Sequence, residues 1–296
     1  MTPTSHGRAR PGDQASLIVH GKDRTGIVAA VSAVLSRHGA NIVQLDQYSD
    51  DPQGGAFFQR TVFGHDTLGV TLPRIEEDLR ALLTQGFDLE FTLRDLAVPQ
   101  RVAIFASREE HCLLDLLWRQ RRGELPIDVA MVISNHPDTA EEVRGFGIPF
   151  IHVPSPAGPD KSAAEAEHLR LLRGNVDFVV LARYMQILSA DFIRQLGVPI
   201  INIHHSFLPA FIGAGPYARA KDRGVKLIGA TAHYVTEDLD EGPIIEQDVV
   251  RVNHADTVAD LQRRGADVER AVLSRAVRWH TEDRVIRHGN HTIVFA

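Results

Sequence analysis

Short apolar segments that alternate with helix-forming segments constrain the fold of residues 101–205 more than any other feature of the sequence. Strands that are apolar almost throughout are typical of a sheet covered by helices on both faces. Regular alternation of strand and helix predicts a parallel, doubly wound α/β sheet. The expected strands are residues 101–107, 128–135, 149–154, 177–184 and 199–204, and the expected helices are residues 112–123, 138–147, 163–174 and 189–197.

The pattern changes after residue 205. Two further strands are expected at 224–235 and 242–252, joined by a polar turn. A long helix is predicted over about 256–279, and a terminal hairpin over 283–296 that turns at Gly289-Asn290.

The N-terminal part has a different order of elements. Strand signals at 16–20, 41–50, 56–65 and 88–95 and helix signals at 27–39 and 72–86 give the order βαββαβ, which is that of a ferredoxin-like unit. We therefore expect a flexible tail at 1–14, a first domain at 15–96, a linker at 97–100 and a second domain at 101–296.

Composition excludes several classes of protein. The net charge of -6 offers no general attraction to nucleic acid or to an anionic membrane. No apolar run approaches the ~18 residues of a membrane span, and no apolar segment of a signal peptide follows the N-terminus. The single cysteine, Cys112, fits a reducing compartment. These features predict a cytoplasmic protein.

Polar residues stand at the end of one buried strand, IINIHH. Asn202 and His204 are two residues apart and so share a face of that strand, at the edge where α/β sheets build their binding sites. Further along, a T-x-H strand segment ends in His233, and the turn DLDEG supplies Asp240. An amide, an imidazole and a carboxylate together can stabilise an oxyanion and move protons.

Two plainer interpretations stay open on this evidence. A histidine at a strand end is commonly a hydrogen-bonded structural residue, and DLDEG alone is an ordinary acidic turn. His204, His205 and His233 could also be zinc ligands, although their spacing matches no known metal motif.

Longer motifs carry a resemblance to a known family. IINIHHSFLPAFIGAGPY and LIGATAHYVTEDLDEGPIIEQD resemble the core of the folate-dependent formyltransferase fold. SREEHCLLDLL, VISNHPD, GADVERAVLSRAV and an N-terminal unit with DRTGIV and GANIVQ extend the likeness to formyltetrahydrofolate deformylases, in which an ACT domain precedes a formyltransferase-type hydrolase domain. The resemblance covers about residue 15 to the end.

The resemblance implies roles for individual residues. Asn202, His204 and Asp240 match the catalytic set, with no metal and no cofactor beyond the substrate, 10-formyltetrahydrofolate. LARYMQIL is similar to the segment that lines the pterin pocket. The substrate-binding residues expected from these motifs are Arg183, Tyr184, Met185, Gln186, Ile187, Leu188, His205, Gly213 and His233.

The activity that the resemblance implies is hydrolysis of 10-formyltetrahydrofolate to formate and tetrahydrofolate, which balances one-carbon pools and supplies formate for purine biosynthesis. Water attacks the formyl carbon, Asn202 and His204 stabilise the oxyanion, and Asp240 orients or deprotonates the water. The role of His205, and whether His204 or Asp240 supplies the proton, stay open. Two alternatives remain: a formyltransferase to an amine such as glycinamide ribonucleotide, and a non-catalytic sensor of folate and amino acids.

One segment bears on the choice between water and an amine. Related formyltransferases carry a Gly/Ser-rich, phosphate-binding loop after their first strand. In this chain Ser107 and Glu110 have the S-x-x-E spacing of a capping box, which predicts carboxylates where a phosphate would bind. This favours hydrolysis, although Arg108 weakens the argument.

The first domain resembles an ACT domain, a fold that often binds amino acids. We expect either an effector site at Asp23, Arg24, Thr25 and Gly26, where the helix begins, or a purely structural module. ACT units commonly pair their sheets, so a homo-oligomer is expected. The sequence departs from the deformylase pattern at Gly215 and at Ala218-Arg219, which puts the loop over the folate in doubt.

Overall fold

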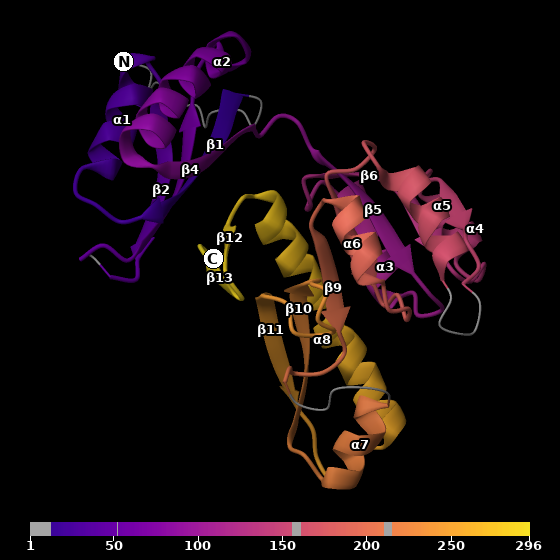
Figure 1. Ribbon diagram of the computed structural model, residues 1–296. Helices are drawn as coiled ribbons and strands as arrows, with labels where there is room; N and C mark the ends of the chain where they lie inside the picture. Colours follow the sequence, from indigo (N-terminus) through magenta and orange to yellow (C-terminus); the bar gives the residue numbers. More distant parts are fainter. Residues whose placement is uncertain (1–12, 52, 156–160, 210–214) are drawn as a thin grey trace, which may run out of the picture. The chain divides into compact units, whose positions relative to one another are not determined.

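The computed structural model describes residues 13–51, 53–155, 161–209 and 215–296, and it divides the chain into two compact units (Figure 1). The first unit contains residues up to Pro99 together with Glu282–Ile286 and Ile293–Ala296. The second contains Gln100–Thr281 and Arg287–Thr292. None of the helices in the described part of the chain combines the length and the apolar composition that crossing a bilayer requires.

The first unit is a four-stranded antiparallel sheet with helices, as the βαββαβ pattern predicts. The strands have the order β2-β3-β1-β4, so β1 and β3 are central. The elements are β1 (Gln14–Lys22), α1 (Ile27–Arg37), β2 (Asn41–Ser49), β3 (Ala56–Gly64), α2 (Leu68–Leu79), the π-helical turn η2 (Arg80–Phe87) and β4 (Leu89–Asp95). Gln14, which we expected in the tail, already belongs to β1.

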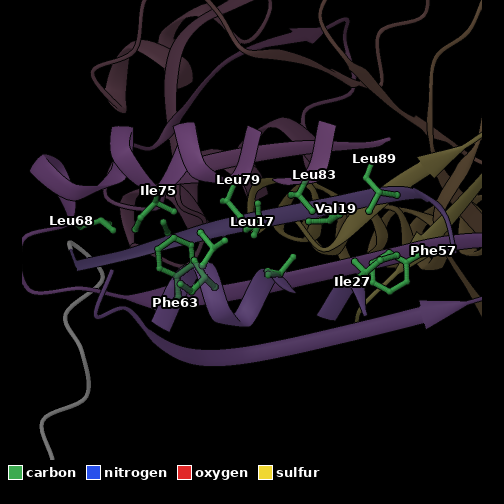
Figure 2. Packing of buried hydrophobic residues seen from close by; sticks show 14 residues of the cluster. Leu17, Val19, Ile27, Phe57, Phe63, Leu68, Ile75, Leu79, Leu83 and Leu89 are labelled. Carbon is green, nitrogen blue, oxygen red and sulfur yellow. The ribbon is translucent and has the colours of Figure 1, made fainter. Parts of the chain in front are cut away.

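Apolar side chains from the strands and the helices of this unit form one core. Leu17 and Val19 of β1, Ile27 of α1 and Leu79 of α2 are buried members of this core (Figure 2). Phe57 and Phe63 of β3 share a face because they are six positions apart, and both belong to the same core. Ile27, Val31, Val34 and Leu35 recur at helical spacing and form the buried stripe of α1, which agrees with the helix signal at 27–39.

The C-terminal segment adds polar contacts to the first unit. The Nε and Nη2 groups of Arg60 donate to the Glu282 carbonyl at 3.1 and 2.9 Å. Arg94 pairs with Asp283 at 2.9 Å between Nη2 and Oδ2. The division of the chain expected from the sequence, with all of 101–296 in the second domain, therefore differs from the structure, which groups Glu282–Ile286 and Ile293–Ala296 with the first unit.

The second unit contains a seven-stranded sheet of order β11-β10-β9-β8-β5-β6-β7. Its strands are β5 (Gln100–Ala106), β6 (Ile127–Ser134), β7 (Phe150–His152), β8 (Phe178–Ala182), β9 (Ile200–His204), β10 (Leu227–Tyr234) and β11 (Ile244–Arg251). Its helices are α3 (His111–Arg121), α4 (Ala140–Gly145), α5 (Ser162–Leu172), α6 (Ala190–Leu196), α7 (Pro216–Arg223) and α8 (Val258–Thr281). The predicted terminal hairpin is present as β12 (Val285–His288) and β13 (His291–Val294).

The order of these strands explains where a site can form. Strands β5 to β9 pair in parallel, as predicted, whereas β10 runs antiparallel to both β9 and β11. The chain builds outward from β5 in one direction through β6 and β7, and in the other through β8 and β9. Ligands bind at such a change of direction, beside the carboxyl ends of the strands. The carboxyl ends of β8 and β9 are Ala182 and His204.

Helix α7 is the element that the sequence pattern did not predict. Gly215 precedes it with φ 63°, Pro216 occupies its first turn, and Gly224 ends it with φ 67°. Both glycines adopt the left-handed region that favours glycine, and proline is well suited to a first turn. The departures at Gly215 and Ala218-Arg219 thus fall at the start of α7 and inside it.

One buried histidine should make stability depend on pH. His168 of α5 is 1% exposed, and its ring lies edge-on to Phe105 with centroids 4.9 Å apart. Burial lowers its pKa from 6.5 to about 4. The unfolded chain therefore binds a proton more readily, and stability is lost as pH falls from 6.5 towards 4, by at most about 3 kcal/mol from this residue.

We expect His168→Leu to flatten the pH dependence of the free energy of unfolding between pH 6.5 and 4, measured by urea denaturation. The exposed His254 offers a matched control, because His254→Leu should leave that dependence unchanged. Parallel curves for His168→Leu and the unmodified chain would contradict this account.

Candidate active site

A cavity of about 290 Å³ opens beside the carboxyl ends of β8 and β9. The segment after β8 forms one wall, the segment after β10 forms another, and the end of β9 lies between them. The lining residues are Leu181, Arg183, Tyr184, Met185, Gln186, Ile187, Leu188, Asn202, Ile203, His204, His205, His233, Val235, Thr236, Glu237, Asp238, Leu239 and Asp240.

The segment after β8 is held by Ser107, at the end of β5. The Ser107 hydroxyl donates to Asn135 Oδ1 at 2.7 Å and accepts a hydrogen bond from the Met185 backbone N–H at 3.0 Å. The Ser107 hydroxyl therefore uses its hydrogen bonds to hold the cavity wall in place. Helix α3 begins only at His111 and has no side-chain cap, so the predicted capping box of Ser107 and Glu110 is wrong.

Asp240 is presented by a tight connection between β10 and β11. Its φ of 59° lies in the left-handed region, and Gly242 passes so close to the Tyr234 carbonyl that a side chain there would collide with it. The Tyr234 N–H donates to the Pro243 carbonyl at 2.9 Å, which closes the turn. The turn that looked like an ordinary acidic loop therefore has a defined path that carries Asp240 to the cavity.

His204 and Asp240 form the central pair of the site. His204 Nδ1 lies 3.2 Å from Asp240 Oδ1, and both side chains are about nine-tenths buried. The hydrogen bond from His204 lowers the pKa of Asp240, against the opposing effect of burial. Asp240 is therefore a carboxylate at neutral pH. The opposite ring nitrogen of His204, Nε2, is buried without a hydrogen-bond partner among the described residues.

Asn202 is oriented by His233 on the neighbouring strand. His233 Nδ1 lies 3.0 Å from the Tyr234 carbonyl, which can only accept, so this nitrogen carries a proton. Burial lowers the pKa of His233 and favours the neutral ring, whose Nε2 then accepts from the Asn202 Nδ2 group at 3.2 Å. This bond fixes the rotation of the Asn202 amide and uses one of its two N–H groups.

His205 stacks on His204 rather than pointing away from it. The ring centroids are 5.4 Å apart with an interplanar angle of 29°. The other neighbour of His205 is Tyr217 of α7, at 6.1 Å between centroids. Burial, followed by the charge of Arg183, lowers the pKa of His205 to about 4, so its ring is neutral near pH 7.

A buried carboxylate, Glu269 of α8, lies beyond Tyr217. It is 2% exposed, accepts a hydrogen bond from the Tyr217 hydroxyl at 2.5 Å and pairs with His111 at 2.8 Å and with Arg183 at 3.4 Å. Although burial opposes the change, His111, Arg183 and Tyr217 lower its pKa to about 2. Cys112 also lies close enough to join a metal-binding group with His111 and Glu269. The hydrogen bonds and ion pairs of Glu269 with His111, Tyr217 and Arg183 are sufficient to explain why these side chains lie together.

Comparison with known proteins agrees with this arrangement. The family model described as formyl transferase matches residues 100–277, and the ACT domain model matches residues 15–80. Formyltetrahydrofolate deformylase of Mycobacterium bovis is 60% identical over 96% of this chain and 91% of its own length. The Bacillus subtilis deformylase is 51% identical over 96% of this chain and 94% of its own. This chain belongs to the formyltetrahydrofolate deformylase family.

Solved structures that resemble this chain include members of the same family and formyltransferases that share the fold of the second unit. A crystal structure of a formyltetrahydrofolate deformylase from Pseudomonas syringae superposes with a TM-score of 0.92 at 47% identity, covering 99% of this chain and 96% of that one. Glycinamide ribonucleotide transformylase 1 from Symbiobacterium toebii superposes with a TM-score of 0.63 at 34% identity, covering 67% of this chain and 95% of that one. The predicted family, its hydrolase class and the two-domain fold are thus confirmed.

The structure brings most of the residues predicted for the site to one cavity. Asn202, His204 and Asp240 line it together, as do His205, His233 and the whole segment 183–188. Tyr184 lines it but is 7% exposed, and its ring packs against Phe105, so it also belongs to the core. Gly213 lies outside the described residues.

The predicted effector residues lie at the start of α1 in the first unit. Gly26 has φ 98° and precedes the helix without a side-chain cap. The Asp23 carboxylate accepts a hydrogen bond from Ser49, and the Arg24 guanidinium donates to the Phe87 carbonyl, so both side chains already have protein partners. Thr25 is exposed.

Sequence reasoning missed two groups of residues. The wall formed by residues 235–239 lies between His233 and Asp240, so their spacing was the signal that could have revealed it. The cluster of His111, Tyr217 and Glu269 was missed although each residue lies in a motif quoted for the resemblance, because the three residues belong to three helices far apart in the chain and only the fold brings them together.

Proposed function

We propose that this chain hydrolyses 10-formyltetrahydrofolate to formate and tetrahydrofolate, and so balances one-carbon pools and supplies formate for purine biosynthesis. The observation that carries the proposal is the cluster of His204, Asp240 and Asn202 in one cavity. Membership of the deformylase family supports it. Because the reaction exchanges no electrons, it requires no redox cofactor.

Both walls of the cavity combine polar backbone with exposed apolar side chains, which suits the polar and the aromatic parts of a folate. Residues 183–188 and 235–239 line the cavity, and we assign backbone N–H and C=O groups of these segments to the polar edge of a pterin. Met185, Ile187 and Leu239 expose apolar surface at 55%, 60% and 58%, although exposed apolar side chains normally cost free energy. We assign these side chains to contact with the aromatic part of the substrate.

The chemistry assigned to the catalytic residues follows from their protonation. Asp240, held as a carboxylate, accepts a proton from the attacking water as its oxygen bonds to the formyl carbon. Asn202 donates the N–H that His233 does not use to the developing oxyanion, and His204 stabilises it through Nε2 when protonated. The carbon–nitrogen bond then breaks, the nitrogen takes a proton, and formate leaves.

An assay of the acceptor tests this function against transfer to an amine. We expect the chain to release formate from 10-formyltetrahydrofolate in the absence of any acceptor, and glycinamide ribonucleotide to leave the rate unchanged. The test matters because the capping-box argument for hydrolysis is wrong, and because glycinamide ribonucleotide transformylases share the fold of the second unit. Formate release that depends on the ribonucleotide would overturn the proposal.

The first unit supports a second, regulatory part of the proposal. We propose that the ACT domain binds an amino acid near the start of α1 and that the chain forms a homo-oligomer. The free N–H groups that follow Gly26 suit a carboxylate. The edge strand β2 exposes Val43, Leu45 and Tyr48, which suits pairing with a second copy.

We expect glycine or methionine to raise the melting temperature of the full chain or to change its rate of formate release. Binding to the folded state alone stabilises it in proportion to the logarithm of ligand concentration. Alanine and glutamate serve as comparison ligands. No response to any amino acid would favour a purely structural role for this domain.

A further inference from the structure

Arg183 occupies a backbone conformation that is unusual for its residue type. Its φ of 61° lies in the left-handed region, where an L side chain is strained. It directly follows β8 and begins the cavity wall. Strained residues persist where the surrounding structure over-determines them, and they concentrate at functional sites. The position of this arginine therefore calls for an explanation beyond packing.

The side chain of Arg183 is turned towards Glu269. It is 11% exposed, and its Nε lies 3.4 Å from Glu269 Oε2. Glu269 is held in turn by the Tyr217 hydroxyl and by His111. Gly265, one turn before Glu269 on α8, leaves the space that the Tyr217 hydroxyl fills, because any side chain there would collide with it. Arg183 is thus fixed at one edge of the site by a buried counter-charge.

His205 lies between this cluster and the catalytic pair. The charged and titratable groups that act on it come from every neighbouring element: Arg183 after β8, His204 in β9, Tyr217 in α7, Asp240 after β10 and Glu269 in α8. Arg183 and a protonated His204 disfavour a charge on His205, whereas Asp240 and Glu269 favour one. The state of His205 depends on this balance and on its burial.

Two stacked imidazole rings with centroids 5.4 Å apart cannot both be protonated without strong repulsion. Asp240 contacts His204 directly, at 3.2 Å, so a proton held by His204 remains beside its counter-charge. A proton on His205 would lie away from that carboxylate and would suppress protonation of His204. Turnover therefore benefits when His205 stays uncharged.

We propose that Arg183, which is anchored by Glu269 and lines the same cavity as His205, is a positioning residue that acts together with burial to keep His205 uncharged against His204, so that His204 alone of the stacked pair exchanges protons with Asp240 and the substrate. His205 is then a neutral wall of the site and not an acid or a base. The kinetic part of this proposal rests on the proposed hydrolysis, whereas the protonation state of His205 can be measured without any substrate.

The first test measures His205 in the unmodified, ligand-free chain. Imidazole carbon-bound proton signals are followed by NMR from pH 8 to pH 5, and His205→Asn identifies the signal. We expect the His205 signal to stay at its neutral position over this range. A His205 midpoint near the ordinary value of 6.5 would overturn the proposal, whatever reaction the chain catalyses.

The second test removes the charge of Arg183. Arg183→Gln should raise the His205 midpoint by about one to three pH units, because a positive charge on the cavity wall is lost while Glu269 keeps its negative charge, held by His111 and Tyr217. With a rise of two units from about 4, about one quarter of the molecules keep a neutral His205 at pH 5.5. The ratio of kcat at pH 5.5 to kcat at pH 8 should then fall about fourfold relative to the unmodified chain.

Arg183→Lys keeps the positive charge. It should therefore have the same ratio of kcat at pH 5.5 to kcat at pH 8, and the same NMR midpoint of His205, as the unmodified chain. The exposed Arg170, which pairs only with Glu167 among the described residues, provides the matched control, and Arg170→Gln should leave the pH profile unchanged. A simple loss of packing at Arg183 would lower kcat at every pH. A pH profile of Arg183→Gln that superposes on that of the unmodified chain would overturn the proposal.

Discussion

Replacing His204 with alanine is expected to lower kcat for hydrolysis of 10-formyltetrahydrofolate by about 100- to 1,000-fold, because it removes a group that stabilises the oxyanion. The ring is also the hydrogen-bond partner that holds Asp240 in its charged form. Asn202→Ala should lose activity to a similar degree, since its amide faces the same cavity. Formate release under saturating substrate measures both changes.

The exposed His152 provides the control for this experiment, because His152→Ala should keep normal turnover. Thermal melting of each variant separates a lost catalytic group from a lost fold. Near-normal kcat in a folded His204→Ala or Asn202→Ala variant would contradict the assignment of these residues.

Replacing Asp240 with asparagine is expected to lower kcat by about 100- to 10,000-fold, the range over which general acid–base groups contribute. Asparagine has nearly the same shape but carries no charge, so it cannot take a proton from water. It also replaces the carboxylate that His204 Nδ1 contacts at 3.2 Å with a neutral amide, which leaves a protonated imidazole without its counter-charge. The substrate KM should change less than kcat, because the cavity walls stay in place.

Asp191, exposed on α6 and outside the cavity, is the matched control for the Asp240 experiment. Asp191→Asn should have the activity of the unmodified chain. If Asp240→Asn retained most of its kcat at pH 7, the base would have to be another group.

Patterns of local sequence were sufficient for most of the fold. The apolar runs of the strands and the helical spacing in α1 reflect which side chains each segment buries, and neighbouring residues are sufficient to show this. Helix α7 was missed because its two glycines and its proline read equally well as a loop. Its helical state is visible only once Tyr217 packs beside α8 and its hydroxyl bonds to Glu269.

The proposed catalytic set could also be predicted from the sequence. Asn202 and His204 share one strand, and Asp240 follows His233 at a fixed spacing, so short-range geometry brings them to one edge of the sheet. The capping-box prediction failed for the opposite reason. Ser107 has Glu110 at the correct spacing for a capping box. Its hydroxyl instead forms hydrogen bonds with Asn135 and Met185, which are distant in the chain.

The sequence by itself therefore predicted most of the order of elements, the family, and the residues Asn202, His204 and Asp240 that line one cavity. Only the tertiary structure decided the ionic state of the site. The tautomer of His233, the neutrality of His205 and the charge of Glu269 depend on burial and on partners from β9, α7 and α8. A pKa depends on distance and solvation in three dimensions, and neither is encoded in the spacing of residues along a chain.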